Sequence, residues 1–157
     1  MSTSPPARWA DFQAAEPAFA TTVRDRFEKY THHVLATLRK DGSPRVTGLE
    51  VTFLEGEVWL GMMPGSLKAL DLRRDPRFAL HANPGSGDSM DGGDVKISGR
   101  AVEVTDAGTV AVFVAAVRPP EPFHLFRVEL VDVVRTVVEG DRLVVRSWRP
   151  GGVVVTH

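Results

Sequence analysis

The segment PGSLK, residues 64–68, combines residue types that could hold a negatively charged group. The pattern that follows predicts a short helix over residues 66–74, which ends at Asp75 because the residue before a proline disfavours helical geometry. A helix N-terminus carries unpaired N–H groups and about half a positive charge. Ser66 and Lys68 would stand at this end, after a tight Pro-Gly turn. The segment therefore indicates a phosphate site; a simple helix cap beside a solvated lysine is the alternative.

The composition is that of an ordinary globular protein. The 157 residues suggest one domain over residues 1–157, with a loose N-terminal segment over residues 1–15. A net charge of -1, from 19 basic and 20 acidic residues, provides no basic footprint for nucleic acid or an anionic membrane surface. The chain has no cysteine, which excludes disulfides, thiolate metal sites and cysteine nucleophiles. No apolar run reaches roughly 18 residues and no signal peptide is present, so we expect a cytoplasmic protein.

Hydrophobic periodicity predicts a mainly β protein with a few short helices. Helices are expected from Pro17 to near Tyr30 and over residues 106–117. Strands are expected over residues 33–39, 44–53, 58–63, 77–82, 95–104, 123–139 (one long strand, or two with a bulge) and 142–148. Asp-Gly and Glu-Gly turns would connect the first three strands as an antiparallel meander, and residues 83–94 form a flexible glycine-rich loop. Such strands favour a closed or partly closed antiparallel barrel, because closure removes exposed edges.

Outside these elements, the sequence shows no known catalytic pattern. His32 and His33 are adjacent on a strand and point to opposite sides, so they cannot easily share a metal. No serine-hydrolase signature occurs. Glu50 interrupts an apolar strand, where it could act as an acid or base beside a cofactor, or face solvent or a subunit interface. We therefore expect no metal site and nominate no catalytic side chain.

The order of these elements, together with the segment GSLKALDLRRDPRFAL, resembles the FMN-binding split barrel of the pyridoxamine 5'-phosphate oxidase superfamily. The likeness extends from about His33 to Trp148. The family pattern is two hairpin strands, a third strand, and a Gly-Ser-x-Lys start to a helix that ends in Asp-Pro-Arg or Asn-Pro-Arg. The resemblance implies an antiparallel split β-barrel that forms a homodimer, with the cofactor in a groove between subunits. Strands containing VELVDVV and RLVVRSW could supply the interface.

The resemblance also implies a phosphate-binding role for the start of the helix. Ser66 and Lys68 match the family residues that grip the cofactor phosphate, and Gly65 precedes them. Leu67 stands where the oxidases themselves have an arginine. Arg73 and the arginine after it could hold a polyanionic cofactor tail or form a solvated helix face.

Other candidate cofactor-binding positions follow from the same resemblance. Thr47 and Thr52 stand where the oxidases carry basic phosphate-binding residues on the second strand, while Arg45 is expected on the opposite face of that strand. Met62 and Met63 would lie along the isoalloxazine ring; the alternative is that these flexible side chains only fill space in the core. A C-terminal aromatic residue, here Trp148, often lies near the partner subunit's cofactor in the family; a core or interface position is the alternative.

The resemblance is nearest to an actinobacterial branch that uses FMN or the deazaflavin coenzyme F-420, of which the segment LRRDPR is typical. It implies an oxidoreductase that transfers hydride to an unknown small substrate. Pyridoxamine 5'-phosphate oxidation itself is not expected, because the C-terminal substrate-binding segment of those enzymes has no counterpart here. The alternatives are a non-catalytic protein that binds flavin or a tetrapyrrole such as haem or biliverdin, and an interaction protein that has lost its cofactor.

Overall fold

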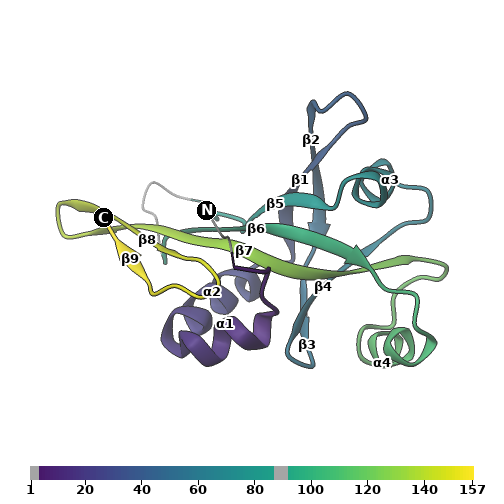
Figure 1. Cartoon of the computed structure of the whole chain (residues 1–157), viewed down its shortest axis with the longest axis horizontal. Helices are drawn as coiled ribbons and strands as arrows, with labels where there is room; N and C mark the ends of the chain where they lie inside the picture. The colour runs from purple at the N-terminus through teal and green to yellow at the C-terminus, as the bar shows by residue number, and fades with distance from the viewer. Residues whose placement is uncertain (1–3, 87–91) are drawn as a thin grey trace.

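The computed structural model describes residues 4–86 and 92–157, and places them around one antiparallel sheet flanked by helices (Figure 1). The helices in these ranges are α1 (Trp9–Ala15), α2 (Pro17–Lys29), α3 (Leu67–Arg74) and α4 (Ala107–Val117). The strands are β1 (His32–Leu38), β2 (Pro44–Glu50), β3 (Thr52–Leu54), β4 (Glu57–Met62), β5 (Arg77–His81), β6 (Asp94–Glu103), β7 (His124–Glu139), β8 (Arg142–Trp148) and β9 (Val155–Thr156). The expected mainly β protein is confirmed. Residues 87–91 of the predicted glycine-rich loop lie outside the described residues.

The sheet bends so that the two ends of its strand order are neighbours in sequence. Its order is β2-β1-β5-β6-β7-β4-β3, with β8 added beside β7 and β9 beside β8. The end strands β2 and β3 are consecutive in the chain and are separated only by Val51. No ladder joins β2 to β3 within the part of the chain that the structure describes. The sheet is therefore not closed, which confirms the expected split barrel.

The break at Val51 corrects two predictions about the first strands. Residues 44–53, expected as one strand, form β2 and β3 with Val51 between them. Strand β2 pairs with β1 and β3 pairs with β4, so two hairpins replace the expected three-stranded meander. Apolar and polar residues alternate through the break, as they do within one strand, so the pattern gives no sign that the chain changes pairing partner there.

Strand β7 is one long strand, which was one of the two forms expected for residues 123–139, and it contains a bulge, which was expected only for the other form. Its register against β6 shifts between the pairs Ser98–Asp132 and Gly99–Leu130, which leaves Val131 as the extra residue. The two backbones come so close here that a Cβ on Gly99 would overlap the carbonyl of Glu129. A glycine is required at this position to keep β6 and β7 paired through the bulge.

The expectation of a loose segment over residues 1–15 is wrong for residues 9–15, while residues 1–3 lie outside the described residues. Residues 9–15 form α1, whose Trp9 and Phe12 are buried. Both side chains pack into the main core, and α1 and α2 cover the same face of the sheet (Figure 1). The polar start and the paired prolines at residues 5–6 obscured this helix, because a helix of seven residues offers only two large apolar side chains to a periodicity argument.

Candidate functional site

The helix α3 begins with the tight turn that the sequence predicted. Gly65 has a φ of +70°, a conformation that favours glycine, and Ser66 follows as the N-cap. The Ser66 hydroxyl accepts a hydrogen bond from the Ala69 N–H at 3.4 Å. The N–H groups of Leu67 and Lys68 have no acceptor within the described residues. The start of α3 is thus both a capped helix end and an outward-facing pair of free amides.

Lys68 is not a solvated side chain. Its Nζ donates a hydrogen bond of 2.8 Å to the carbonyl oxygen of Gly48 on β2. Burial lowers the pKa of Lys68 from its usual value, because removal from water disfavours the charged form. Leu67, by contrast, is 58% exposed and points away from the core. The lysine therefore brings a partly desolvated positive charge close to the first turn of α3.

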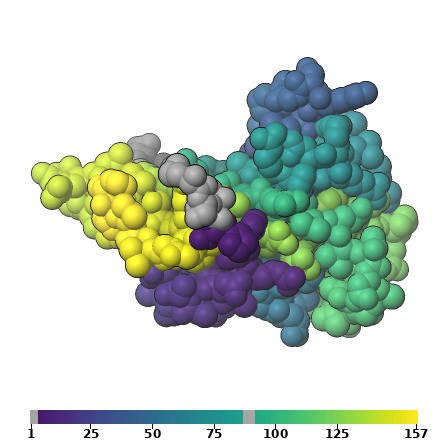
Figure 2. Space-filling model, in the orientation of Figure 1, coloured from purple at the N-terminus to yellow at the C-terminus, as the bar shows by residue number. Residues whose placement is uncertain are grey.

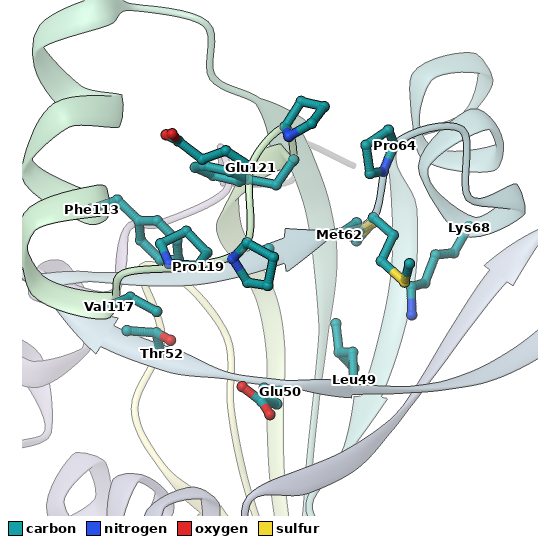
Figure 3. A pocket seen from close by; sticks show the side chains of 15 residues that line it. Leu49, Glu50, Thr52, Met62, Pro64, Lys68, Phe113, Val117, Pro119 and Glu121 are labelled. Atoms are coloured by element: carbon teal, nitrogen blue, oxygen red, sulfur yellow. The ribbon is translucent and has the colours of Figure 1, made fainter.

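A pocket of about 390 Å³ opens beside this lysine (Figure 3). Its walls come from the β2–β3 junction, the end of β4, the start of α3, and the segment from α4 to β7. The lining residues are Leu49, Glu50, Thr52, Gly61, Met62, Met63, Pro64, Lys68, Phe113, Val117, Pro119, Pro120, Glu121, Pro122 and Phe123. Figure 3 shows Lys68 reaching from α3 towards the strand that carries Leu49, with Phe113 and Val117 on the opposite side.

The pocket is mostly apolar, with a few charged groups. Met62 is buried, whereas Met63 is 78% exposed, so the two methionines do not share one role. Glu50 and Glu121 are exposed carboxylates that line the pocket together with Lys68. An apolar concave surface with a small number of charged groups is the usual form of a small-molecule site.

The structure brings together only part of the candidate set from the sequence. Thr52, Met62, Met63 and Lys68 line the pocket. Gly65, Ser66 and Leu67 lie between two lining residues, Pro64 and Lys68, and form its edge rather than its wall. The remaining two candidates, Thr47 and Trp148, are not among the lining residues.

Thr47 lies on the inner side of β2, and so does Arg45, contrary to the expectation that they would face opposite sides. Strand residues two apart share a face, and Arg45, Thr47 and Leu49 are the less exposed positions of β2. The Thr47 hydroxyl is buried without a hydrogen-bond partner in the described structure. A buried hydroxyl of this kind is able to hydrogen-bond a further group.

Trp148 lies in the core, which was one of the two alternatives for it. It is 3% exposed, and its ring lies 4.7 Å from that of Phe12 on α1, between ring centroids. The position is set by the pairing of Trp148 with Val133 on β7. Within its own chain, Trp148 therefore stabilises the packing of α1 and does not reach the pocket.

Asp71 is a buried carboxylate that the sequence analysis overlooked. It accepts hydrogen bonds from Thr37 Oγ1 at 2.8 Å, Arg45 Nε at 2.7 Å and an Arg74 Nη at 3.0 Å. Burial opposes its charge, but these hydrogen bonds and the charge of Arg45 outweigh burial and lower the pKa of Asp71. Arg45 and Arg74 are thus held by α3 itself. The only indication of this cluster in the sequence is the spacing of Asp71 and Arg74, which are three residues apart on one helix.

The other arginine of the LRRDPR segment is also paired within the chain. Arg73 forms two hydrogen bonds of 2.8 Å with the carboxylate of Glu103 on β6. His124, at the start of β7, contacts both residues and accepts a hydrogen bond from the Gly65 N–H at 3.2 Å. The sequence indicates no role for His124, because the β4–β7 register that places it beside Met62 cannot be read from residue spacing.

The structure thus combines a split barrel with a mostly apolar pocket at the start of a helix. Residues 19–136 match the family model described as pyridoxamine 5'-phosphate oxidase, and the chain therefore belongs to this family. Comparison with curated proteins finds no match.

Several solved structures share the fold. A pyridoxamine 5'-phosphate oxidase-related, FMN-binding protein from Nostoc punctiforme is 14% identical, with a TM-score of 0.64 and coverage of 90% of this chain and 94% of that one. A putative pyridoxamine 5'-phosphate oxidase from Listeria innocua is 14% identical, with a TM-score of 0.60 and coverage of 73% and 95%. A heme-binding protein from Mycobacterium smegmatis is 16% identical, with a TM-score of 0.60 and coverage of 95% and 60%. At these identities, the likeness shows the fold alone.

Two classes of feature are missing from the part of the chain that the structure describes. No helix there is both long and apolar enough to span a bilayer. No group of three or more His, Asp or Glu side chains there is placed to bind a metal ion.

Proposed function

We propose that this protein binds FMN and acts as an oxidoreductase on a small substrate. The observation that carries the proposal is Lys68, which lines the apolar pocket and whose partly buried ammonium donates to the Gly48 carbonyl oxygen. It belongs to the first turn of α3, where two N–H groups lack an acceptor among the described residues. An anionic tail would bind at the amides and the lysine, and a flat aromatic ring would lie against the apolar wall. Membership of the pyridoxamine 5'-phosphate oxidase family supports this reading.

The residues present fit such a cofactor. The N–H groups of Leu67 and Lys68 lack acceptors among the described residues, and the buried Thr47 hydroxyl on the same side of β2 as Leu49 lacks a partner. The volume of about 390 Å³ lies within the usual range of small-molecule sites, roughly 300–1,000 Å³. Thioethers and aromatic rings in the wall, such as Met62 and Phe123, suit contact with a conjugated ring.

The flavin would supply the hydride chemistry, and this chain's residues would bind it and shape its surroundings. Phe113, Val117 and the prolines at residues 119, 120 and 122 would exclude water from one side of the pocket. Glu50 and Glu121 would disfavour a second anion at the open side and so select a neutral or cationic substrate. No side chain is required as a catalytic acid or base.

The pairing of the two α3 arginines favours FMN over coenzyme F-420. A longer polyanionic tail would call for free cations beyond the first turn of α3. Arg73 is instead bound by Glu103, and Arg74 by Asp71 and the carbonyl oxygen of Leu38. The pocket also contains no histidine, cysteine or tyrosine, which are common axial ligands of haem; a methionine remains the available ligand for the haem-binding alternative.

We propose further that the protein is a homodimer. Part of the expected interface is used internally, since Val128, Leu130 and Val133 are buried in the core. The hairpin of β7 and β8 instead carries Val138 and Leu143, which are 51% and 61% exposed. Figure 2 shows that this end of the molecule projects from the body. Two exposed apolar side chains on a projecting hairpin are suited to a second subunit.

Visible absorption and ligand titration test the proposed function. The protein is incubated separately with FMN, coenzyme F-420 and haemin, and unbound ligand is then removed. It should retain about one FMN per chain and much less F-420 or haemin. The FMN complex should then be reduced chemically and reoxidised by small conjugated substrates under anaerobic conditions. Retention of haemin alone would favour the tetrapyrrole-binding alternative, and retention of none would contradict both.

A further inference from the structure

The turn that starts α3 is attached to a histidine from a different strand. The Gly65 N–H donates a hydrogen bond to His124 Nε2 at 3.2 Å. His124 Nδ1 lies 3.3 Å from Glu103 Oε2 and 3.0 Å from an Arg73 Nη. Arg73 belongs to the last turn of the same helix and is paired with Glu103. The imidazole thus connects the first turn and the last turn of α3 through β6 and β7.

The proton positions in this network are limited by the number of acceptors. A neutral imidazole accepts at one nitrogen and donates at the other. Because Gly65 donates to Nε2, the ring proton must be on Nδ1, where the Glu103 carboxylate can accept it. With the proton on Nδ1, the 3.0 Å contact between an Arg73 Nη and Nδ1 is not a hydrogen bond, and that Nη donates to Glu103 Oε2 instead.

We infer that His124 is a positioning residue of the anion site, which holds the Gly65 turn by accepting the Gly65 N–H at Nε2. The inference depends on the proposed function, because the turn matters through the ligand bound at α3. Among the described residues, the charged groups that contact the ring are Glu103 of β6 and Arg73 of α3, and both contacts are at Nδ1, which leaves Nε2 to Gly65.

Two substitutions separate the roles of the two ring nitrogens. In His124→Gln the amide group reaches the place of Nε2, so an oxygen can accept from Gly65 without titrating. In His124→Asn the amide lies near the place of Nδ1 and cannot reach Gly65. The phosphate contribution is measured as the ratio of the dissociation constants for riboflavin and FMN at pH 7.5. We expect the Gln variant to keep this ratio and the Asn variant to lose about five- to tenfold of it, as the loss of one hydrogen bond predicts.

The amide resonance of Gly65 provides a readout that needs no ligand. At pH 7.5 its ¹H and ¹⁵N shifts should be similar in the wild type and in His124→Gln, which keeps an acceptor for the Gly65 N–H. In His124→Asn, which removes that acceptor, they should differ clearly from the wild-type shifts. A Gly65 amide that is insensitive to both His124 substitutions would overturn the inference, and so would an Asn variant with an unchanged ratio.

Failure of the proposed function would be seen separately. Equal affinities of the wild type for FMN and riboflavin would contradict the anion site, and with it the positioning role of His124, even where the Gly65 amide shift responds to the His124 substitutions. A clear preference for FMN, combined with an insensitive Gly65 amide, would leave the proposed function standing and remove only the inference about His124.

Discussion

The Nζ of Lys68 lies 2.8 Å from the carbonyl oxygen of Gly48, and this hydrogen bond joins α3 to β2 at the edge of the pocket. A lysine held in this way has lost part of its side-chain freedom before any ligand arrives. It also keeps donors free, since an ammonium has three. The same lysine can therefore fasten the helix and bind an anion, and its two tasks do not compete.

Replacement of this lysine should weaken binding through the phosphate alone. In Lys68→Ala the binding free energy for FMN should become less favourable by about 1.5–3 kcal/mol, the range of a hydrogen bond to a charged group, while that for riboflavin should change little. Isothermal titration calorimetry with both ligands measures this. Lys96→Ala, which removes an exposed lysine from β6, is the matched control and should affect neither ligand. Equal weakening of FMN and riboflavin would show that Lys68 acts only through the fold.

Loss of the Asp71 carboxylate should destabilise the fold more than loss of an exposed ion pair. Asp71→Asn leaves the partly buried Arg45 without its partner and should lower the free energy of unfolding by about 3 kcal/mol. Urea denaturation at neutral pH measures the change. Asp75→Asn removes an ion pair with the largely exposed Arg77 and should cost much less. Similar losses in both variants would mean that the Asp71 cluster adds no special stability.

His33 should make stability depend on pH. Its Nε2 lies 2.8 Å from the Phe27 carbonyl oxygen and its Nδ1 accepts from the Asn83 N–H at 2.9 Å, so the ring is neutral. Burial lowers the pKa of His33 below its usual 6.5 and outweighs the backbone acceptor Phe27, which raises it. The unfolded chain then binds more protons below pH 6.5, and the free energy of unfolding should fall as the pH drops through this value.

The contribution of His33 is isolated by comparing two variants. His33→Gln should be less stable than the wild type at pH 7.5 but should lose less on transfer to pH 5.5, as measured by urea denaturation at both values. His32→Gln, at the exposed neighbouring position, should keep the wild-type slope. A His33 variant with the full wild-type loss would assign the pH dependence to other groups.

The unexpected helix α1 should be a major stabilising element. Phe12 is fully buried and contacts the rings of Trp9 and Trp148, so Phe12→Ala should cost about 3–5 kcal/mol. Thermal or urea unfolding followed by tryptophan fluorescence reports this directly. Val153→Ala, at a residue that is largely exposed, is a control with little expected effect. A Phe12 variant as stable as the control would show that the packing of α1 adds little to the stability of the fold.

Local features of the site could be predicted from the sequence, whereas long-range ones could not. The Pro-Gly turn, the Ser66 cap and the end of α3 before Pro76 depend on neighbouring residues, and the structure agrees with each. The contacts of Lys68 with Gly48 and of His124 with Gly65 depend on register and on the curvature of the sheet. These follow from pairings between distant segments, which composition and periodicity do not specify.

The difference between local and long-range features also decides which walls of the pocket could be predicted. The resemblance to the pyridoxamine 5'-phosphate oxidase superfamily predicts Met62 and Met63 beside the cofactor, because in that family this segment lies along the isoalloxazine ring. The wall contributed by Phe113, Val117 and the following prolines was missed, because it reaches the pocket only when the connection between α4 and β7 folds over β4. The pairing of Gly61 with Leu125 fixes that approach. A proline-rich turn gives no indication in the sequence of the surface it will cover.

The most direct test of the account is the affinity of the wild-type protein for FMN relative to riboflavin, measured by titration under identical conditions. The two ligands share the isoalloxazine ring and differ in the phosphate, so their ratio reports on the α3 site alone. Binding of FMN at least about tenfold tighter than riboflavin is the predicted result, in line with a charge-assisted hydrogen bond. Equal affinities, or no binding of either ligand, would contradict the assignment of an anion site to Lys68 and the first turn of α3.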